Sequence, residues 1–228
     1  MKLFVINLKR STDRKDEISK QLLKIPNDKF ESLFFDAIDG SKNEHLTFEK
    51  HFSKLAKFLR GRPLTNGELA CFASHYSLWK HCTEINEPIL ILEDDIIILP
   101  HFETAIELIS KSNYNYVKLA CTFNKKQHQI EPHFITTTAE SCGTQGYYLT
   151  PAAAKLFLQK AKKWYKPVDD YLDSFWIHKV QTIIYSPHTI ANNDKYDSTI
   201  TTRKINIPIK ITDKVNKALK YGTTSISI

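Results

Sequence analysis

The amino-acid sequence predicts an α/β fold, in which helices cover a sheet that contains parallel strands. Its 228 residues are 42% hydrophobic, so the chain can bury the core of a domain. The first forty residues contain a strand, a helix and a second strand in that order. Residues 89–92 form a wholly apolar run between Pro88 and three carboxylates, which is typical of a fully buried parallel strand. We therefore expect one domain over residues 1–200, followed by an appendage over residues 201–228.

The opening strand–helix–strand unit is expected over residues 2–8, 13–25 and 34–38. Apolar side chains recur on one face of the predicted helix. No GxGxxG motif follows the first strand, so nothing in the residues favours a dinucleotide-binding fold. Asp39 and Gly40, directly after the second strand, can turn the chain beside a nucleotide.

The clearest helix signal begins at Thr65. Thr65 and Glu68 have the spacing of a capping box, and apolar side chains follow at helical intervals as far as residue 85. Glu68 therefore has a structural explanation. The preceding residues 41–63 are basic and polar around a few apolar side chains, which favours an amphipathic helix or a mobile excursion, and we assign them no chemistry.

The second half of the chain alternates between helices and strands. Two glycines, Gly143 and Gly146, permit close backbone approach to a ligand, and Pro151 suits the first turn of a helix. The expected elements are a helix over 102–110, a strand over 116–120, a loop and hairpin over 121–140, helices over 152–161 and from 168, and a strand over 182–185.

Three consecutive carboxylates, Glu93, Asp94 and Asp95, follow the buried apolar strand. Open α/β sheets bind ligands beyond the carboxyl ends of their strands, and adjacent carboxylates repel one another unless a cation lies among them. Oxygen ligands of this kind suit Mg²⁺ or Mn²⁺, which bridge protein carboxylates to substrate phosphates. A solvated acidic loop is the alternative, but the apolar residues on both sides favour a metal site and a phosphorylated or nucleotide-linked substrate.

The charge of the chain is concentrated at its C-terminus. Residues 201–228 hold six basic side chains against Asp213 alone, and contribute +5 of the formal net charge of +7. Their spacing predicts a basic helix, for which two interpretations are equally open: attachment to an anionic membrane surface, or a solvated helix packed on the domain. Basic and aromatic residues do not interleave as in nucleic-acid-binding motifs, so we expect no nucleic-acid partner.

Cysteine content and hydropathy point to a cytoplasmic protein. No apolar run approaches the roughly 20 residues needed to cross a bilayer, and the first residues become polar too soon for a signal peptide. Four cysteines show neither a CxxC spacing nor the density of a disulfide scaffold, so reduced thiols are expected.

Six segments together resemble glycosyltransferase family 25, the group that contains bacterial lipopolysaccharide galactosyltransferases, including β-1,4-galactosyltransferases, and the collagen galactosyltransferases. They occur in the family's order and cover about residues 1–190. The segments are 5–10 (VINLKR) with Arg14, 37–40 (AIDG), 64–79 (LTNGE through SH to Trp79), 92–95 (LEDD), 143–149 (GTQGYYL) with Ala154, and 168–169 (VD).

The resemblance implies a GT-A-type, single Rossmann-like domain with a mixed, mostly parallel central sheet. It also implies a nucleotide-sugar donor, with UDP-galactose as the leading expectation, a divalent cation (Mn²⁺ or Mg²⁺), and inversion at the anomeric carbon. By position, Glu93 and Asp95 resemble the outer members of the family's acidic metal motif, while Asp94 faces the ribose or sugar of the donor. His188 is a further candidate metal ligand through a ring nitrogen.

Inversion requires a base that accepts the proton of the acceptor hydroxyl, and Asp169 and Asp170 are the candidates. Asp169 matches the family's position. Helix capping is the alternative role for both, since they fall in the first turn of the predicted helix from residue 168.

The remaining predicted site residues fall into two groups. The donor-binding candidates are Asn7, Leu8, Arg10, Arg14, Ile38, Asp39, Gly40, Glu68, His75 and Asp94. The acceptor-binding candidates are Tyr147, Tyr148, Tyr171 and Trp176, whose rings offer flat faces to a sugar although aromatic residues are more often core.

Two functions follow from these interpretations. The first is a metal-dependent inverting glycosyltransferase that acts on an oligosaccharide or lipid-linked saccharide in lipopolysaccharide, lipooligosaccharide or capsule assembly, with its basic tail at the cytoplasmic face of the membrane. The alternative is a catalytically inactive relative that serves as a carbohydrate-binding or adhesion module. UDP binding that depends on metal favours the first, and glycan binding indifferent to both favours the second.

Overall fold

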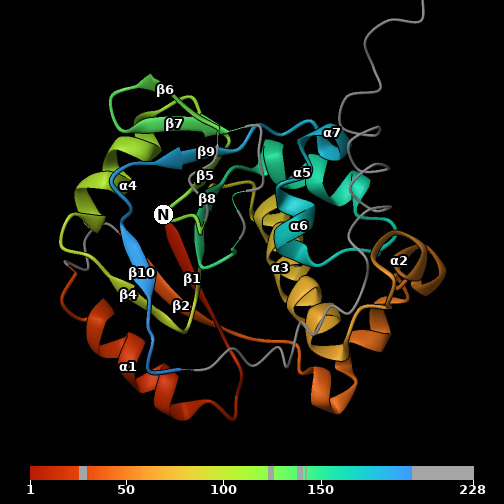
Figure 1. Ribbon diagram of the computed structural model, residues 1–228. Coiled ribbons are helices and arrows are strands. Elements are labelled where there is room, and N and C mark those ends of the chain that lie inside the picture. Colours follow the sequence, from red (N-terminus) through yellow and green to blue (C-terminus); the bar gives the residue numbers. More distant parts are fainter. Residues whose placement is uncertain (26–29, 123–125, 138–140, 142, 197–228) are drawn as a thin grey trace, which may run out of the picture.

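The computed structural model describes residues 1–25, 30–122, 126–137, 141 and 143–196. They form a three-layered α/β arrangement, with a central sheet between two groups of helices (Figure 1). The predicted basic tail, residues 201–228, lies outside the described residues, as do the last residues of the predicted domain. Within the described residues, no helix is long and apolar enough to cross a membrane.

The chain opens with the predicted strand–helix–strand unit. It comprises β1 (Lys2–Asn7), α1 (Thr12–Leu22) and β2 (Glu31–Asp36). β1 pairs in parallel with β2 and also with β3 (Ile89–Glu93), which places the carboxyl ends of all three strands at one edge of the sheet. The predicted buried strand is confirmed, because the first four residues of β3 are fully buried.

The sheet is mixed, as predicted, and most of its strands run in one direction. Its order in the described part of the chain is β2-β1-β3-β8-β5-β9-β7-β6. β8 is antiparallel to both neighbours and β7 is antiparallel to both of its own, so the other six of the eight strands share a direction. The further strands are β5 (Tyr116–Lys118), β6 (Gln127–Glu131), β7 (Phe134–Thr137), β8 (Gly146–Leu149) and β9 (Ile183–Tyr185).

A second, small sheet forms just beyond the carboxylates. The apolar residues after Asp95 form β4 (Ile96–Ile98), which pairs antiparallel with β10 (Ile190–Asn192). This pairing carries the chain after β10 back to the carboxyl end of β3, where the backbone N–H of Asn193 donates a 2.8 Å hydrogen bond to the carbonyl of Asp95.

The longest helix, α3 (Asn66–Ile85), begins with the predicted capping box. The Glu68 N–H donates to Thr65 Oγ1 at 3.1 Å, and the Thr65 N–H donates to Glu68 Oε2 at 2.8 Å. The region before it contains two short 3₁₀ helices, η1 (Gly40–Lys42) and η2 (Glu44–Phe48), and the helix α2 (Ser53–Arg60). The remaining helices are α4 (Phe102–Lys111), α5 (Pro151–Lys160), α6 (Val168–Leu172) and α7 (Phe175–His178).

Each face of the sheet has its own apolar core. α1 and α4 pack on one face through residues such as Ile18 and Ile106, whereas α3, α5 and α6 pack on the other through Trp79 and Phe157 (Figure 1). Burial of both faces explains why the central strands are apolar without interruption. The helices hold the sheet edge that carries Glu93 in a fixed position between them.

Candidate active site

A cleft of about 800 Å³ lies at the carboxyl ends of β1, β2 and β3. Because β8 runs antiparallel to β3, its amino end and the preceding loop also reach this edge. Most of the residues predicted from the sequence line the cleft. They are Leu8, Arg10, Arg14, Ile38, Gly40, Glu68, His75, Glu93, Asp94, Asp95 and Asp169.

The three carboxylates after β3 have different partners. Asp94 is held by the protein, since Asn7 Nδ2 donates to its Oδ2 at 2.6 Å and Arg14 donates to its Oδ1 at 3.3 Å. Asp95 has a weaker contact to the same guanidinium at 3.4 Å. Asn7 itself does not line the cleft, so it acts on the site through Asp94.

Burial among neighbouring carboxylates raises the pKa of Asp95 to about 7. Burial is the largest cause, and the charges of Glu93 and Asp94 add to it, while Arg14 opposes them. Burial likewise raises the pKa of Asp94. The pKa of Glu93 is lowered instead: its burial acts in the opposite direction but is outweighed by His75, Thr144 and Arg14.

This donor set fits a divalent cation. The carboxylates supply hard oxygen atoms, and a single guanidinium compensates their negative charge only in part. The raised pKa of Asp95 reflects its burial and the charges of the neighbouring carboxylates, and a bound cation would offset both. Asp95 and Glu93 are the residues best placed to hold Mg²⁺ or Mn²⁺.

Glu93 is fixed by the loop that precedes β8. Thr144 Oγ1 donates a hydrogen bond to Glu93 Oε1, and the backbone N–H of Glu93 donates to the carbonyl of Gln145 at 2.9 Å. Sequence reasoning noted the glycines of this loop but did not identify Thr144 as a partner of the acidic residues, because nothing in a single threonine indicates which strand it contacts.

The two candidate bases differ in position. Asp169, at the start of α6, is largely buried and lines the cleft, and its Oδ1 accepts the backbone N–H of Asp170 at 3.0 Å. Asp170 forms an ion pair with Arg60 and does not line the cleft. Burial and the neighbouring Asp169 raise the pKa of Asp170, against the effect of Arg60. The geometry therefore separates a cleft carboxylate, Asp169, from a carboxylate that joins α6 to α2.

Gly40 lines the cleft, and Asp39, directly before it, pairs with a residue of the lining. Asp39 forms an ion pair with Arg10 and accepts hydrogen bonds from the N–H and hydroxyl of Ser41 at 2.9 and 2.6 Å. Burial would raise the pKa of Asp39, yet Ser41 and Arg10 keep it below its usual value. Gly40 lies against the start of α3, where a Cβ atom would come within 2.5 Å of the Asn66 carbonyl oxygen.

Glu68 lines the cleft but is occupied by structural contacts. Besides closing the capping box, its carboxylate accepts two hydrogen bonds from Arg62, at 2.8 and 2.7 Å. Burial would raise its pKa, and these bonds keep it below the usual value. Its structural role is therefore established by geometry, whereas its role toward a donor stays a prediction.

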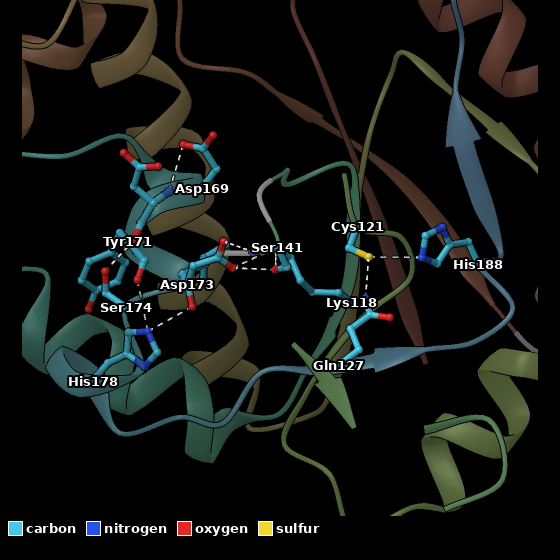
Figure 2. A network of polar contacts seen from close by, with 12 residues as sticks. Lys118, Cys121, Gln127, Ser141, Asp169, Tyr171, Asp173, Ser174, His178 and His188 are labelled. Atoms are coloured by element: carbon cyan, nitrogen blue, oxygen red, sulfur yellow. Dashed lines mark hydrogen bonds and ion pairs between the residues drawn. The ribbon is translucent and has the colours of Figure 1, made fainter. Parts of the chain in front are cut away.

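Besides Asn7, Asp39 and Asp170, five predicted site residues lie outside the cleft. The rings of Tyr147, Tyr148 and Tyr171 are buried in the two cores and present no face to a sugar, which corrects their interpretation as acceptor-binding residues. Trp176 is half-buried and contacts Lys166, whose Nζ lies 5.4 Å from the ring centroid. His188 Nε2 lies 3.3 Å from Cys121 Sγ (Figure 2). Because His188 does not line the cleft, it does not join the carboxylates as a metal ligand.

The segment that follows β10 was not predicted as part of the site. Asn192, Asn193, Asp194 and Tyr196 line the cleft, and the Tyr196 ring centroid lies 4.9 Å from Arg14 Cζ. The Tyr196 ring thus covers the guanidinium that contacts Asp94 and Asp95. β10 has only three residues, too few for a periodic sequence signal.

A buried polar network connects the sheet to the end of α6 (Figure 2). Lys118 Nζ donates to Ser141 Oγ at 2.7 Å and to Asp173 Oδ1 at 3.1 Å, and the N–H of Ser141 donates to Asp173 Oδ2 at 2.8 Å. Lys118 belongs to β5, and Asp173 directly follows the helix that carries Asp169. The network therefore fixes α6 relative to the sheet.

Several known proteins are similar to this chain in sequence. A procollagen lysyl hydroxylase and glycosyltransferase of Acanthamoeba polyphaga mimivirus is 37% identical over 171 residues, which cover 68% of this chain and 19% of that protein. The lipooligosaccharide biosynthesis protein lic2B of Haemophilus influenzae is 31% identical over 167 residues, 67% of this chain and 60% of that protein. Procollagen galactosyltransferase 1-B of Xenopus laevis is 26% identical over 221 residues, 90% of this chain and 34% of that protein.

The chain spans less than two thirds of the length of each of these relatives. The family model described as glycosyltransferase family 25 (LPS biosynthesis protein) matches residues 1–172 of the 228. That interval includes the carboxylates after β3 and Asp169 at the start of α6. The chain belongs to glycosyltransferase family 25.

Proposed function

We propose that this protein is an inverting, divalent-metal-dependent glycosyltransferase that moves galactose from UDP-galactose to a saccharide acceptor in lipopolysaccharide, lipooligosaccharide or capsule assembly. The observation that carries the proposal is the pairing, in one cleft, of an acidic cluster whose Asp95 has a pKa raised to about 7 with a separate carboxylate, Asp169. The names of the galactosyltransferase and lipooligosaccharide relatives support the sugar and the assembly process.

Asp95 and Glu93 are the residues that would hold the cation. When bound there, Mn²⁺ or Mg²⁺ supplies positive charge that neutralises the diphosphate of the leaving nucleotide. Thr144 orients the Glu93 carboxylate, and Asn7 and Arg14 fix Asp94 beside it. These partners keep the cluster preorganised, which lowers the cost of ordering it when the substrate binds.

The donor binds to the side of the cleft that is formed by residues at the carboxyl ends of β1 and β2. Arg10 and Arg14 provide guanidinium groups that can donate hydrogen bonds to phosphate oxygens, although each is also paired with a carboxylate. Gly40 has no Cβ atom, which allows the backbone after β2 to lie against the start of α3. Leu8 and Ile38 add apolar surface suited to the face of a base.

Asp169 acts as the base. Its carboxylate accepts the proton of the attacking acceptor hydroxyl, while the acceptor oxygen forms the new bond to the anomeric carbon and the bond from that carbon to the leaving phosphate breaks. Attack on the face opposite the leaving group inverts the configuration. Largely buried at the cleft, Asp169 is shielded from bulk water.

The proposed acceptor is an oligosaccharide or lipid-linked saccharide, and a basic tail over residues 201–228 would keep the enzyme at the cytoplasmic face of the membrane. Loss of anionic-liposome binding on deletion of this tail is the expected result, and binding that survives the deletion contradicts the membrane role.

The neighbouring aspartates offer a matched test of the mechanism. Asp169→Asn should reduce transfer from UDP-galactose with Mn²⁺ at least about 100-fold, the lower range of general-base catalysis. Asp170→Asn changes the same group one residue away, outside the cleft, and should retain most of the activity. Equal losses in the two variants, or full activity in Asp169→Asn, would contradict the assignment of the base.

A further inference from the structure

Three side chains of different chemistry meet on the floor of the cleft. Cys71 and His75 lie one turn apart on α3, and Glu93 ends β3. A ligand atom from each, the Cys71 Sγ, a His75 ring nitrogen and a Glu93 carboxylate oxygen, lies within 4.8 Å of the other two. The i, i+4 spacing on one helix face is the usual way in which a helix offers two ligands to one ion.

The nitrogen that faces this group has no hydrogen-bond partner among the described residues. His75 is 0% exposed, and its Nε2 is buried without a partner. That atom lies 3.4 Å from Glu93 Oε1, a distance at which a protonated ring would form an ion pair, but without the geometry of a hydrogen bond. A buried polar atom without a hydrogen bond lowers the stability of the fold, and a bound ion is one way in which such an atom is satisfied.

The other side of the imidazole is held by a buried hydrogen-bonded pair. His75 Nδ1 lies 2.8 Å from the hydroxyl of Tyr147, and that hydroxyl accepts the indole N–H of Trp79 at 2.9 Å. Histidines that ligate metals are oriented in this way by a partner on the opposite nitrogen, which fixes the ring and its tautomer. When Nδ1 donates to the Tyr147 oxygen, Nε2 carries no proton and can offer its lone pair to an ion bound beside Glu93.

We propose that Cys71, His75 and Glu93 form a binding site for a borderline-soft divalent ion such as Zn²⁺, and that this site shares Glu93 with the oxygen site that Asp95 and Glu93 offer to Mg²⁺ or Mn²⁺. A thiolate, an imidazole and a carboxylate are ligands that Zn²⁺ accepts in tetrahedral sites, and the cleft leaves the fourth position to water. Adjacent ligand atoms in such a site are about 3.5 Å apart, so small rotations of the Cys71 and Glu93 side chains complete it.

Binding involves a defined exchange of protons. Burial and the nearby Glu93 raise the pKa of Cys71 well above its usual value, so the free site contains a thiol. On binding, the Cys71 sulfur releases its proton to solvent and donates an electron pair to the ion, while His75 binds as the neutral ring and Glu93 as the carboxylate. The ion then balances the negative charge of two of its three ligands.

Cobalt spectroscopy tests the site without turnover, so the result is independent of the proposed transferase activity. Co²⁺ added to the metal-free full-length protein should produce a thiolate-to-cobalt charge-transfer band that Zn²⁺ abolishes and excess Mg²⁺ does not. Cys71→Ser should remove this band and weaken Zn²⁺ binding, measured by competition with a chelating dye, at least about 10-fold.

Cys121→Ser is the matched control, because Cys121 is also partly buried beside a histidine, yet lies outside the cleft. It should retain both the band and the Zn²⁺ affinity. His75→Gln provides a second variant that keeps the cysteine, and it should weaken Zn²⁺ binding while leaving the far-ultraviolet circular dichroism unchanged. Absence of the charge-transfer band in the unmodified protein, its persistence in Cys71→Ser, or its loss in Cys121→Ser would each overturn the proposal.

Discussion

Replacement of Lys118 by methionine should destabilise the protein by about 3–5 kcal/mol, because it leaves a buried carboxylate without its cation. The side chains of Lys118 and Asp173 are 1% and 2% exposed, and Nζ lies 3.1 Å from Oδ1. Ser141 still donates its N–H and hydroxyl to Asp173 in the variant, at 2.8 Å each, so we expect a loss near the lower end of this range.

Urea unfolding followed by tryptophan fluorescence measures this loss. Lys111→Met is the matched control, since Lys111 pairs with Glu107 at 2.6 Å but the two side chains are 70% and 44% exposed, and the change should cost less than about 1 kcal/mol. Because Lys118→Met and Asp173→Asn remove partners of one buried pair, the double variant should be less destabilised than the sum of the single variants. A loss below about 1 kcal/mol for Lys118→Met, or strict additivity, would refute the view that this ion pair joins α6 to the sheet.

Three further predictions concern stability. Burial lowers the pKa of His178 from 6.5 to about 4. The free energy of unfolding should therefore fall by about 3 kcal/mol as the pH decreases from 6.5 toward 4, because the unfolded state binds the proton first. His178→Gln should make this decrease smaller in equilibrium unfolding measured across that range. Gly40→Ala should lower the melting temperature, because the new Cβ would lie 2.5 Å from the Asn66 carbonyl; an unchanged melting temperature would show that the backbone there can move. Arg62→Met should cost about 1.5–3 kcal/mol in urea unfolding by removing both hydrogen bonds to the buried Glu68 carboxylate, and a change within about 0.5 kcal/mol would contradict that contribution.

Local signals in the sequence predicted local structure well. The capping box of Thr65 and Glu68 depends on residues three positions apart, and α3 begins as expected. The apolar run before Glu93 indicated a strand buried on both faces, and β3 has this character. Because parallel strands present their carboxyl ends at one edge, the meeting of Leu8, Ile38 and the acidic cluster around one cleft was also predictable in outline.

Contacts between distant segments were not predictable in the same way. The alternation of Tyr147 and Tyr148 in β8 places one ring in each core, which requires knowing that the strand lies inside a sheet covered on both faces. His188 follows β9 as expected, but only the pairing of β9 with β5 shows that it meets Cys121 rather than the carboxylates. Cys71 carried no signal of its own, since a single cysteine in a helix is usually a small apolar residue.

The most direct test of the central claim, that Asp95 holds a cation against a nucleotide-sugar diphosphate, is the thermal stabilisation of the protein by UDP with and without Mn²⁺. A ligand that binds the native state raises the melting temperature according to its affinity. The account predicts that UDP raises the melting temperature of the unmodified protein only when Mn²⁺ is present, and that Asp95→Asn abolishes the increase while Asp16→Asn, at an exposed position on α1, retains it. Stabilisation by UDP that is equal without Mn²⁺, or unchanged in Asp95→Asn, would contradict it.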